Sequence, residues 1–500
     1  MLPHLLDPKQ SLPALAAAAQ EKNLIEDLGL APLFDAMAEG DEGRREIVQR
    51  VVLRWPCRDN ATVRYRQAVF ADLCAQPTRA QAIFTLAETS LALPGQSHQF
   101  WLFSKSPSRR LRANTALMRE LIKQLQALRD LGSSGSDSFH SEALRKLFSN
   151  LQKEIDAEFL RAAHEALAAL QLDAGLRSAA TVDALGRCTA SVLHGGVANG
   201  SWLGRVWHAT GEDAGFSIAD RDEAGQTALG KLRERLLTQT ARVLDDAVAR
   251  VLQFFRLLRD ELHFYLAAHT LYQKLQRQGM PCSLPELQEE GGLLDASGLY
   301  SPLLPLRGEA TVGNDIHALD KKLVLITGAN RGGKSTLLRA IGIAQLWAES
   351  GLYGFAVEMR TALCGAVFSH FQQEEDASLR RGKFAEELQR MHNMVPQLRP
   401  GVMMLFNESF AATNEQEGSE VARQITLALR DAGIRVVFVT HLYSFAKELF
   451  DKEHENILFL RASGEQGNAP FQLLPGAPEA SSFAQEIYQK VFSESLQTQK

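Results

Sequence analysis

The segment Gly328–Ser335 reads GANRGGKS, and its residue types and spacing are those of a phosphate-binding loop. It fits the pattern GxxxxGK[ST] in full. Glycines in such a loop let backbone N–H groups curve around a phosphate. Lys334 is expected to reach the β- and γ-phosphates, and the Ser335 hydroxyl is expected to bind Mg²⁺. The segment therefore predicts binding of ATP together with Mg²⁺.

The sequence on either side of this loop agrees with that interpretation. An apolar strand, Leu323–Thr327, precedes it, and a helix, Ser335–Ser350, follows it. The free N–H groups and the dipole at the helix start favour an anion, and a chance glycine-rich turn would lack this context. The nucleotide-binding residues expected here are Gly328, Asn330, Gly332, Gly333, Lys334, Ser335 and Thr336.

Two further strand ends carry polar residues. Val402–Phe406 leads into Asn407 and Glu408, and Arg435–Thr440 leads into His441. An Asp is usual where Asn407 stands, and an Asn brings no charge to Mg²⁺. Glu408 would orient or deprotonate the attacking water, unless it only caps a loop. His441 would sense the γ-phosphate, unless it is structural. The expected metal ligands are Ser335, Asn407 and Glu408, and the expected catalytic residues are Glu408, His441 and Lys334.

The strands and helices that position these residues come after Pro281–Pro305, a stretch rich in Pro and Gly that we interpret as a domain boundary. Beyond it, short apolar runs alternate with helices. Besides the strands above, Leu363–Ser369 is expected to be a strand and Gly418–Ala432 a helix. Alternation of this kind predicts a mostly parallel sheet covered by helices.

Before that boundary the chain has the pattern of long amphipathic helices. Asn23–Met37 is a first candidate, and Leu111–Leu131, Ser141–Leu172 and Thr227–Gln278 follow. Patterns of such length are typical of packed long helices or a coiled-coil arm. A short helix, Phe483–Val491, is expected near the end.

The bulk composition excludes several classes of protein. Lys plus Arg number 54 and Asp plus Glu 59, so the net charge of −5 gives no global attraction to polyanions. The 5 cysteines are scattered, which favours reduced thiols over zinc or disulfides. No signal peptide and no membrane-spanning run of about 18 apolar residues is found. We therefore expect a cytoplasmic protein.

These motifs together resemble the ATPase domain of the MutS family of DNA mismatch-repair proteins, which belongs with the ABC-type ATPases. The resemblance covers about 311–446. Asn314 begins an NDI element, which contacts the nucleotide base in the family, and Gly328–Asn330 is similar to its GPN. Phe384 and Glu387 are similar to the STFxxEM element, and Thr440–His441 matches the family's TH.

Three features depart from the family pattern. Asn407 replaces an Asp, and the signature loop, roughly GRGTST in the family, reads FAATNE from Phe410 to Glu415. In the family a Ser of this loop reaches the γ-phosphate of the partner subunit, and Asn414, beside Thr413, occupies that place. Finally, there is no room ahead of the core for the family's mismatch-reading domain.

The resemblance implies an α plus α/β fold with four parts. Residues 1–95 would begin a helical core, and 96–290 would form a lever or clamp arm and a returning core helix. Residues 300–475 would form the P-loop ABC-type ATPase domain, and 476–500 a helical tail.

Three other groups of residues were considered as sites. Lys105–Arg112, with Arg119, Lys123 and Arg129, is the most basic stretch, and it would meet DNA phosphates or be an ordinary solvated helix face. Trp202 and Trp207 would stack on bases or lie in a core. The acidic run from Glu374 to Asp376 would position water or form a solvated loop.

The sequence thus predicts a homodimeric MutS-like ATPase with ATP-driven clamp motion on double-stranded DNA, in mismatch repair or recombination. Partners would be the second copy, DNA and a repair protein, with no membrane, in the cytoplasm or at the nucleoid. The alternative is an ABC-like mechanical ATPase whose arms grip a protein. A kinase-like phosphotransferase fits less well, because Glu408 and His441 suit attack by water.

Overall fold

The computed structural model describes residues 2–17, 21–96, 106–133, 139–170, 177–182, 188–194, 223–372, 382–453, 455–462 and 470–478. The chain divides into two compact units. Unit 1 contains Met1–Leu5 and Gln76–Leu262, and unit 2 contains Leu6–Ala75 and His263–Lys500. Several predicted features lie outside the described residues, namely the helix Phe483–Val491, Trp202, Trp207 and the acidic run from Glu374 to Asp376.

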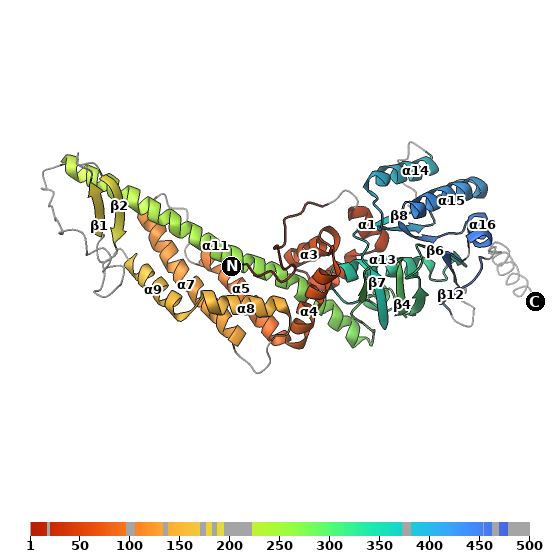
Figure 1. Cartoon of the computed structure of the whole chain (residues 1–500), viewed down its shortest axis with the longest axis horizontal. Helices are drawn as coiled ribbons and strands as arrows, with labels where there is room; N and C mark the ends of the chain where they lie inside the picture. The colour runs from red at the N-terminus through yellow and green to blue at the C-terminus, as the bar shows by residue number, and fades with distance from the viewer. Residues whose placement is uncertain are drawn as a thin grey trace, which may run out of the picture. The chain divides into compact units, whose positions relative to one another are not determined.

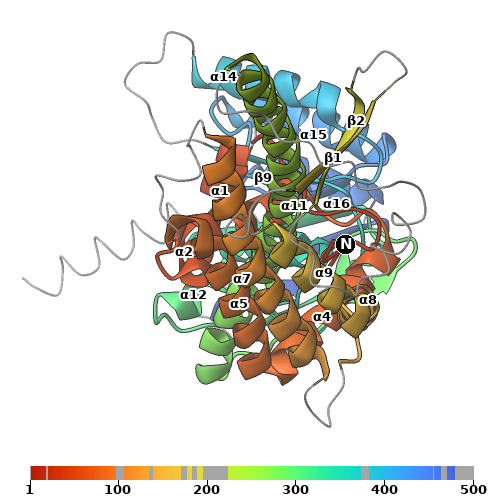
Figure 2. The same cartoon turned by 90° about the vertical axis from the view of Figure 1, so that its left-hand side faces the viewer.

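Unit 1 is built mainly from long helices. They are α5 (Pro77–Gln96), α7 (Pro107–Ser133), α8 (Glu142–Glu154), α9 (Ala157–Ala169) and the first part of α11 (Glu223–Arg277). Helices α5 and α7 lie side by side (Figure 2). The leucines that recur every three or four positions in α7 are buried, as the amphipathic pattern predicts.

Two features of unit 1 differ from the prediction. A single helix over Ser141–Leu172 is wrong, because α8 ends at Glu154 and α9 begins after Asp156. The Asp156 carboxylate accepts a hydrogen bond from the N–H of Phe159, so it caps a new helix start. In addition, β1 (Arg177–Val182) and β2 (Cys188–His194) form an antiparallel pair that the sequence did not indicate.

Unit 2 begins with short helices. They are α1 (Glu21–Leu28), α2 (Ala31–Ala38), α3 (Glu42–Gln49) and α4 (Asn60–Ala75), with a π-helical turn at Arg50–Arg54. The predicted continuous helix Asn23–Met37 is therefore wrong. Gly29 separates α1 from α2 with φ of 68°, a left-handed conformation that ends the first helix.

Unit 2 contains a small sheet whose strands lie on both sides of the phosphate loop in the sequence. It contains β3 (Glu286–Gln288), β4 (Leu294–Leu299), β5 (Asn314–His317) and β7 (Glu358–Ala362), in the order β3-β7-β4-β5. Only β3 and β7 run parallel. A short helix, α12 (Leu303–Leu306), lies between β4 and β5 in the chain.

The larger sheet has the order β12-β11-β6-β10-β9-β8. Its strands are β6 (Leu323–Gly328), β8 (Val367–Phe371), β9 (Met403–Asn407), β10 (Arg435–Val439), β11 (Ile457–Ala462) and β12 (Leu473–Pro475). All neighbours are parallel except β11 and β12. The predicted helical N-terminal region and mostly parallel sheet are thus confirmed. The strand predicted at Leu363–Ser369 is placed wrongly, because β8 begins only at Val367.

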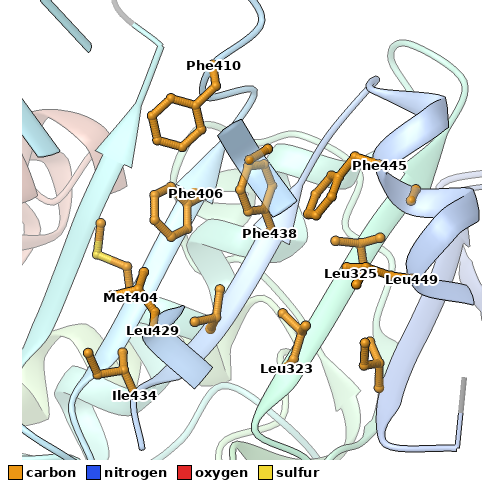
Figure 3. Close-up of a cluster of buried hydrophobic side chains, with 14 of the residues drawn as sticks. Leu323, Leu325, Met404, Phe406, Phe410, Leu429, Ile434, Phe438, Phe445 and Leu449 are labelled. Carbon is orange, nitrogen blue, oxygen red and sulfur yellow. The ribbon is translucent and has the colours of Figure 1, made fainter. Parts of the chain in front are cut away.

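Helices cover both faces of this sheet. They are α13 (Lys334–Glu349), α14 (Lys383–Met394), α15 (Glu415–Asp431) and α16 (Tyr443–Glu453), with a 3₁₀ turn at Val395–Gln397 (Figure 1). On one face Phe406 and Phe438 stack at 4.8 Å and pack with Phe445 of α16 (Figure 3). Side chains of a strand alternate between faces, so Leu405 points the other way, toward Gly342 of α13.

Among the described residues, no helix combines the length and apolarity needed to cross a bilayer. Cys57, Cys74, Cys282 and Cys364 are free thiols.

Candidate functional site

The predicted phosphate loop lines a cleft of about 350 Å³ in unit 2. The loop joins the end of β6 to the start of α13, between Gly328 and Lys334. Gly328 has φ of 112° and lies so close to the backbone of Ala462 that a Cβ there would come within 2.7 Å of its carbonyl oxygen. Gly333, with φ of 88°, directly precedes the helix. Both positions therefore require glycine.

Lys334 is buried at the base of this loop. Its Nζ donates to the carbonyl oxygens of Gly328 and Ala329, both at 2.8 Å. Burial lowers the pKa of the Lys334 ammonium to about 8, an effect that the carboxylate of Glu408 partly opposes. A buried cation whose hydrogen bonds among the described residues go to neutral carbonyls is suited to meet an anion in the cleft.

Ser335 and Asn407 meet although they are far apart in the sequence. The Ser335 hydroxyl donates to Oδ1 of Asn407 at 2.8 Å. Asn407 is the last residue of β9. Strands β9 and β6 both run parallel to β10, so their carboxyl ends lie at the same edge of the sheet. Hydroxyl and amide oxygens, with the carboxylate of Glu408 next in sequence, are the hard oxygen ligands that Mg²⁺ prefers. The residues present therefore fit the metal.

Glu408 and His441 form a hydrogen-bonded pair. Nε2 of His441 lies 2.8 Å from Oε1 of Glu408 and donates to it, because an ionised carboxylate can only accept. This hydrogen bond is the main reason that the pKa of Glu408 is lowered, with burial opposing it. Glu408 has φ of 55°, and its N–H donates to the carbonyl of Val439 at 2.9 Å. The carboxylate is thus held ionised at the cleft that it lines.

Ser409, next to Glu408 in the chain, belongs to a buried polar group that the sequence did not indicate as a unit. Nδ1 of His370 lies 2.8 Å from the Ser409 hydroxyl, and Nε2 of His370 lies 3.1 Å from the carbonyl of Glu387. The Glu387 carboxylate accepts from the N–H of Phe410 at 2.8 Å. Burial lowers the pKa of His370 to about 3, so its ring is neutral. Of these residues, the sequence indicated only Glu387, as part of the element that is similar to STFxxEM.

Phe410 takes a backbone conformation that is rare for its type. Its φ is 66°, and its side chain is fully buried. The ring stacks on His370 at 5.4 Å. It also contacts Phe406, as Figure 3 shows. The segment that follows Glu408 is therefore fixed by aromatic packing and by the hydrogen bonds of Ser409 and Phe410.

Asn314 lies on the cleft wall, where its amide binds backbone groups. Its Nδ2 donates to the carbonyl of Phe471 at 3.4 Å, and its Oδ1 accepts from the N–H of Leu473 at 2.7 Å. Phe471 also lines the cleft, and sequence reasoning missed it. Asn330, Gly332, Gly333, Ser335 and Thr336 line the cleft as well.

Thr413 and Asn414 lie at the start of α15 and outside the lining of this cleft. Oδ1 of Asn414 accepts from the N–H of Glu417 at 2.9 Å and so caps the helix. The Thr413 hydroxyl donates to the Glu417 carboxylate at 2.7 Å. The structure therefore does not bring this loop to the cleft of its own chain.

Several side chains of the basic stretch have partners within unit 1. Arg110 pairs with Asp245 of α11. Arg119 donates to the carbonyl of Leu167, and Arg129 donates to the carbonyl of Ile155. These arginines join helices of unit 1 to one another, so they are not simply a solvated face.

Two family models match the chain. Residues 58–278 match the MutS2 N-terminal domain, and residues 324–479 match MutS domain V. The curated relatives include proteins named Endonuclease MutS2. That of Thermus thermophilus is 28% identical over 281 residues, 53% of this chain and 36% of the relative. That of Streptococcus sanguinis is 26% identical over 394 residues, 76% of this chain and 48% of the relative. This chain thus spans less than half the length of either relative.

Proposed function

Because the chain belongs to the MutS family, we propose that it is a P-loop ATPase of the ABC type that hydrolyses ATP with Mg²⁺ and acts on double-stranded DNA. The observation that carries the proposal is the placement of the Glu408–His441 pair beside the phosphate loop. Glu408 lines the same cleft as Lys334 and Ser335, and its carboxylate is kept ionised by the hydrogen bond from His441.

In the proposed reaction each residue has a separate task. The N–H groups of the loop and the ammonium of Lys334 bind the β- and γ-phosphates. To do so, Lys334 gives up its hydrogen bonds to the carbonyls of Gly328 and Ala329 and donates to phosphate oxygens instead. Ser335 and Asn407 would hold Mg²⁺, which would supply charge neutralisation of the phosphate oxygens. Glu408 accepts a hydrogen bond from the attacking water and orients it in line with the γ-phosphate. His441 keeps the carboxylate aimed and senses the γ-phosphate.

A second copy of the chain would complete the site. Thr413 and Asn414 lie outside the cleft of their own chain, and the family's corresponding loop works across a dimer. In the proposed dimer this loop contacts the γ-phosphate of the partner's ATP, so ATP tightens the dimer and hydrolysis releases it. Light scattering should show a larger species with ATP than without it, and a monomer in both conditions would contradict this step.

Membership of the MutS family supports DNA as the proposed partner. In this proposal the helical unit 1 is the clamp, and a repair protein is a further partner. The proposed place of action is the nucleoid. Cleavage of DNA, which the relatives' name states for those proteins, is not proposed here. The chain spans less than half of them, and the cleft lined by the phosphate loop supports binding of a nucleotide.

The test is steady-state hydrolysis of ATP with Mg²⁺, alone and with homoduplex, mismatched and branched DNA. Turnover that changes with DNA and disappears in Lys334→Ala and Glu408→Gln would support the proposal, and the most effective DNA would identify the substrate. Turnover that no DNA changes would support the alternative, an ATPase whose arms act on a protein. Release of phosphate in the absence of any other acceptor would exclude a kinase.

A further inference from the structure

The backbone that carries Glu408 is bent in a way that its residue types disfavour. Glu408 has φ of 55° and Phe410 has φ of 66°, so the two bulky residues on either side of Ser409 lie in the left-handed region. Such conformations persist only where the surroundings hold them firmly, and they gather at functional sites. The contacts that hold this bend therefore bear on the carboxylate of Glu408, which lines the cleft.

Ser409, in the middle of the bend, is held by β8. Its side chain is fully buried, and its hydroxyl lies 2.8 Å from Nδ1 of His370 and donates to the carbonyl of the same residue. Nε2 of His370 donates to the carbonyl of Glu387 at 3.1 Å, which leaves Nδ1 of the neutral ring as an acceptor. One hydroxyl proton is thus shared by two acceptors of His370, and this contact fixes both side chains.

Phe410, at the end of the bend, is held by α14. Its N–H donates to the carboxylate of Glu387 at 2.8 Å, and its ring stacks on His370. Burial raises the pKa of Glu387, and the hydrogen bond from Phe410 opposes this effect. Burial disfavours the charge of a carboxylate, so stability alone does not account for an acid at this place.

The three side chains that hold the bend lie outside the lining of the cleft. Glu408 is fixed on its other sides by different partners, since its N–H donates to the carbonyl of Val439 and its carboxylate accepts from His441. The buried group therefore has one route to a bound nucleotide, which is the direction in which Glu408 points.

We propose that His370 and Glu387 are positioning residues for Glu408. Through Ser409 and the backbone of Phe410 they aim the catalytic carboxylate at the attacking water. The inference goes beyond the proposed function, because it assigns a role to residues outside the cleft, and it rests on that function, because it needs Glu408 to act on water. A misplacement of about 1 Å at a reacting group can lower a rate by about two orders of magnitude.

The first experiment measures kcat for ATP with Mg²⁺ and the Kd for a non-hydrolysable ATP analogue on the full chain. Ser409→Ala, which removes the hydroxyl with little change of volume, should lower kcat about tenfold or more and leave Kd unchanged. Ser419→Ala is the matched control. Ser419 of α15 is also buried, and its hydroxyl makes no hydrogen bond among the described residues. This control should keep both values.

The pH profile of kcat separates positioning from a merely structural role. The hydrogen bond from His441 holds the pKa of Glu408 low, and a displaced carboxylate would lose part of this bond. In Ser409→Ala the acid limb of kcat should therefore move to higher pH although His441 is intact. A variant that only lowers the fraction of folded protein would reduce kcat at every pH and leave the limb in place.

Two substitutions at Glu387 test the second contact. Glu387→Gln keeps an oxygen that accepts from the N–H of Phe410, and Glu387→Leu does not. The leucine variant should lose kcat and keep Kd, whereas the glutamine variant should retain most of the activity. Thermal midpoints show which variants are folded, and if Glu387→Leu is not, Ser409→Ala decides alone.

An unchanged kcat in Ser409→Ala, or an equal loss in Ser419→Ala, would overturn the positioning role. A loss of kcat matched by a weaker Kd would overturn it as well, since the group would then act on the whole cleft. Glu408→Gln separates these results from failure of the proposed function. If Glu408→Gln is inactive while Ser409→Ala keeps its kcat, only the positioning role fails. If Glu408→Gln hydrolyses ATP as the unaltered protein does, the proposed function fails and the positioning role with it.

Discussion

The hydroxyl of Ser335 donates a hydrogen bond of 2.8 Å to Oδ1 of Asn407, so two of the residues expected to hold Mg²⁺ are in direct contact. The bond links the first turn of α13 to the end of β9. It also shows what the Asn at this position can do. It orients the serine hydroxyl without adding a negative charge.

Asn407→Asp should strengthen Mg²⁺ binding. The carboxylate would still accept from Ser335 and would add one charge next to the metal, and the charge count of oxygen ligands sets affinity for hard cations. We expect the Mg²⁺ concentration that half-saturates ATP hydrolysis to fall roughly tenfold, the equivalent of about 1.4 kcal/mol. Asn407→Gln, which stays neutral, should show no such fall. An Asp variant with the Mg²⁺ dependence of the unaltered protein would contradict this account.

ATP affinity should decline as pH rises through about 8. Burial lowers the pKa of Lys334 to about that value in the free protein, so the ammonium is largely charged below it and neutral above it. Phosphate binds the charged form and raises its pKa. Affinity is therefore complete below pH 8 and should fall by up to about tenfold per unit above it. Titrations between pH 7 and 9.5 measure this, with Lys334→Arg, which stays charged, expected to be flat. A flat profile for the unaltered protein would refute it.

Removing His441 should shift the acid limb of the pH profile of kcat upward. The hydrogen bond from His441 is the main cause of the lowered pKa of Glu408. In the unaltered protein the carboxylate of Glu408 therefore stays ionised to lower pH. In His441→Ala the pKa of Glu408 rises, and activity is lost earlier as pH falls. His441→Gln keeps an N–H donor and should show a smaller shift. Identical acid limbs in the alanine variant and the unaltered protein would remove His441 from this role.

Phe410→Gly should destabilise the protein although glycine suits the backbone better. In the resemblance to the family pattern GRGTST, Phe410 stands where the first glycine would be, and its φ is 66°, in the left-handed region. Relief of that conformation returns about 1–2 kcal/mol. Loss of a fully buried phenylalanine costs about 3–5 kcal/mol. The net loss, about 1–4 kcal/mol, is measurable by urea denaturation, with Phe410→Leu as a control for side-chain volume. A glycine variant of equal or greater stability would show that the ring contributes little.

The sequence indicated those residues of the candidate site whose signal is local. The phosphate loop, Glu408 and His441 each follow an apolar strand directly, so their spacing was sufficient. The contacts of His370 with Ser409 and of Asn314 with Phe471 join residues 39 and 157 positions apart, and no periodicity reports such pairs. The long helices were found for the same local reason. The break at Asp156 was missed because the amphipathic pattern continues across it while a capping side chain restarts the helix.

Unit 2 is discontinuous in the sequence, since Leu6–Ala75 belongs to it and its remainder begins only at His263. On the ribosome, the first segment emerges long before the strands on which its helices pack. Arg66, which is 1% exposed, donates to the carbonyls of Leu6 and Trp55 of the first segment, but its third acceptor, the carbonyl of Ser350, is absent until the later segment has been made. Unit 1 lies between the two segments in the chain and can fold as an insertion meanwhile. Nascent chains that end near residue 262 should therefore protect unit 1 from proteolysis while leaving Leu6–Ala75 open to it.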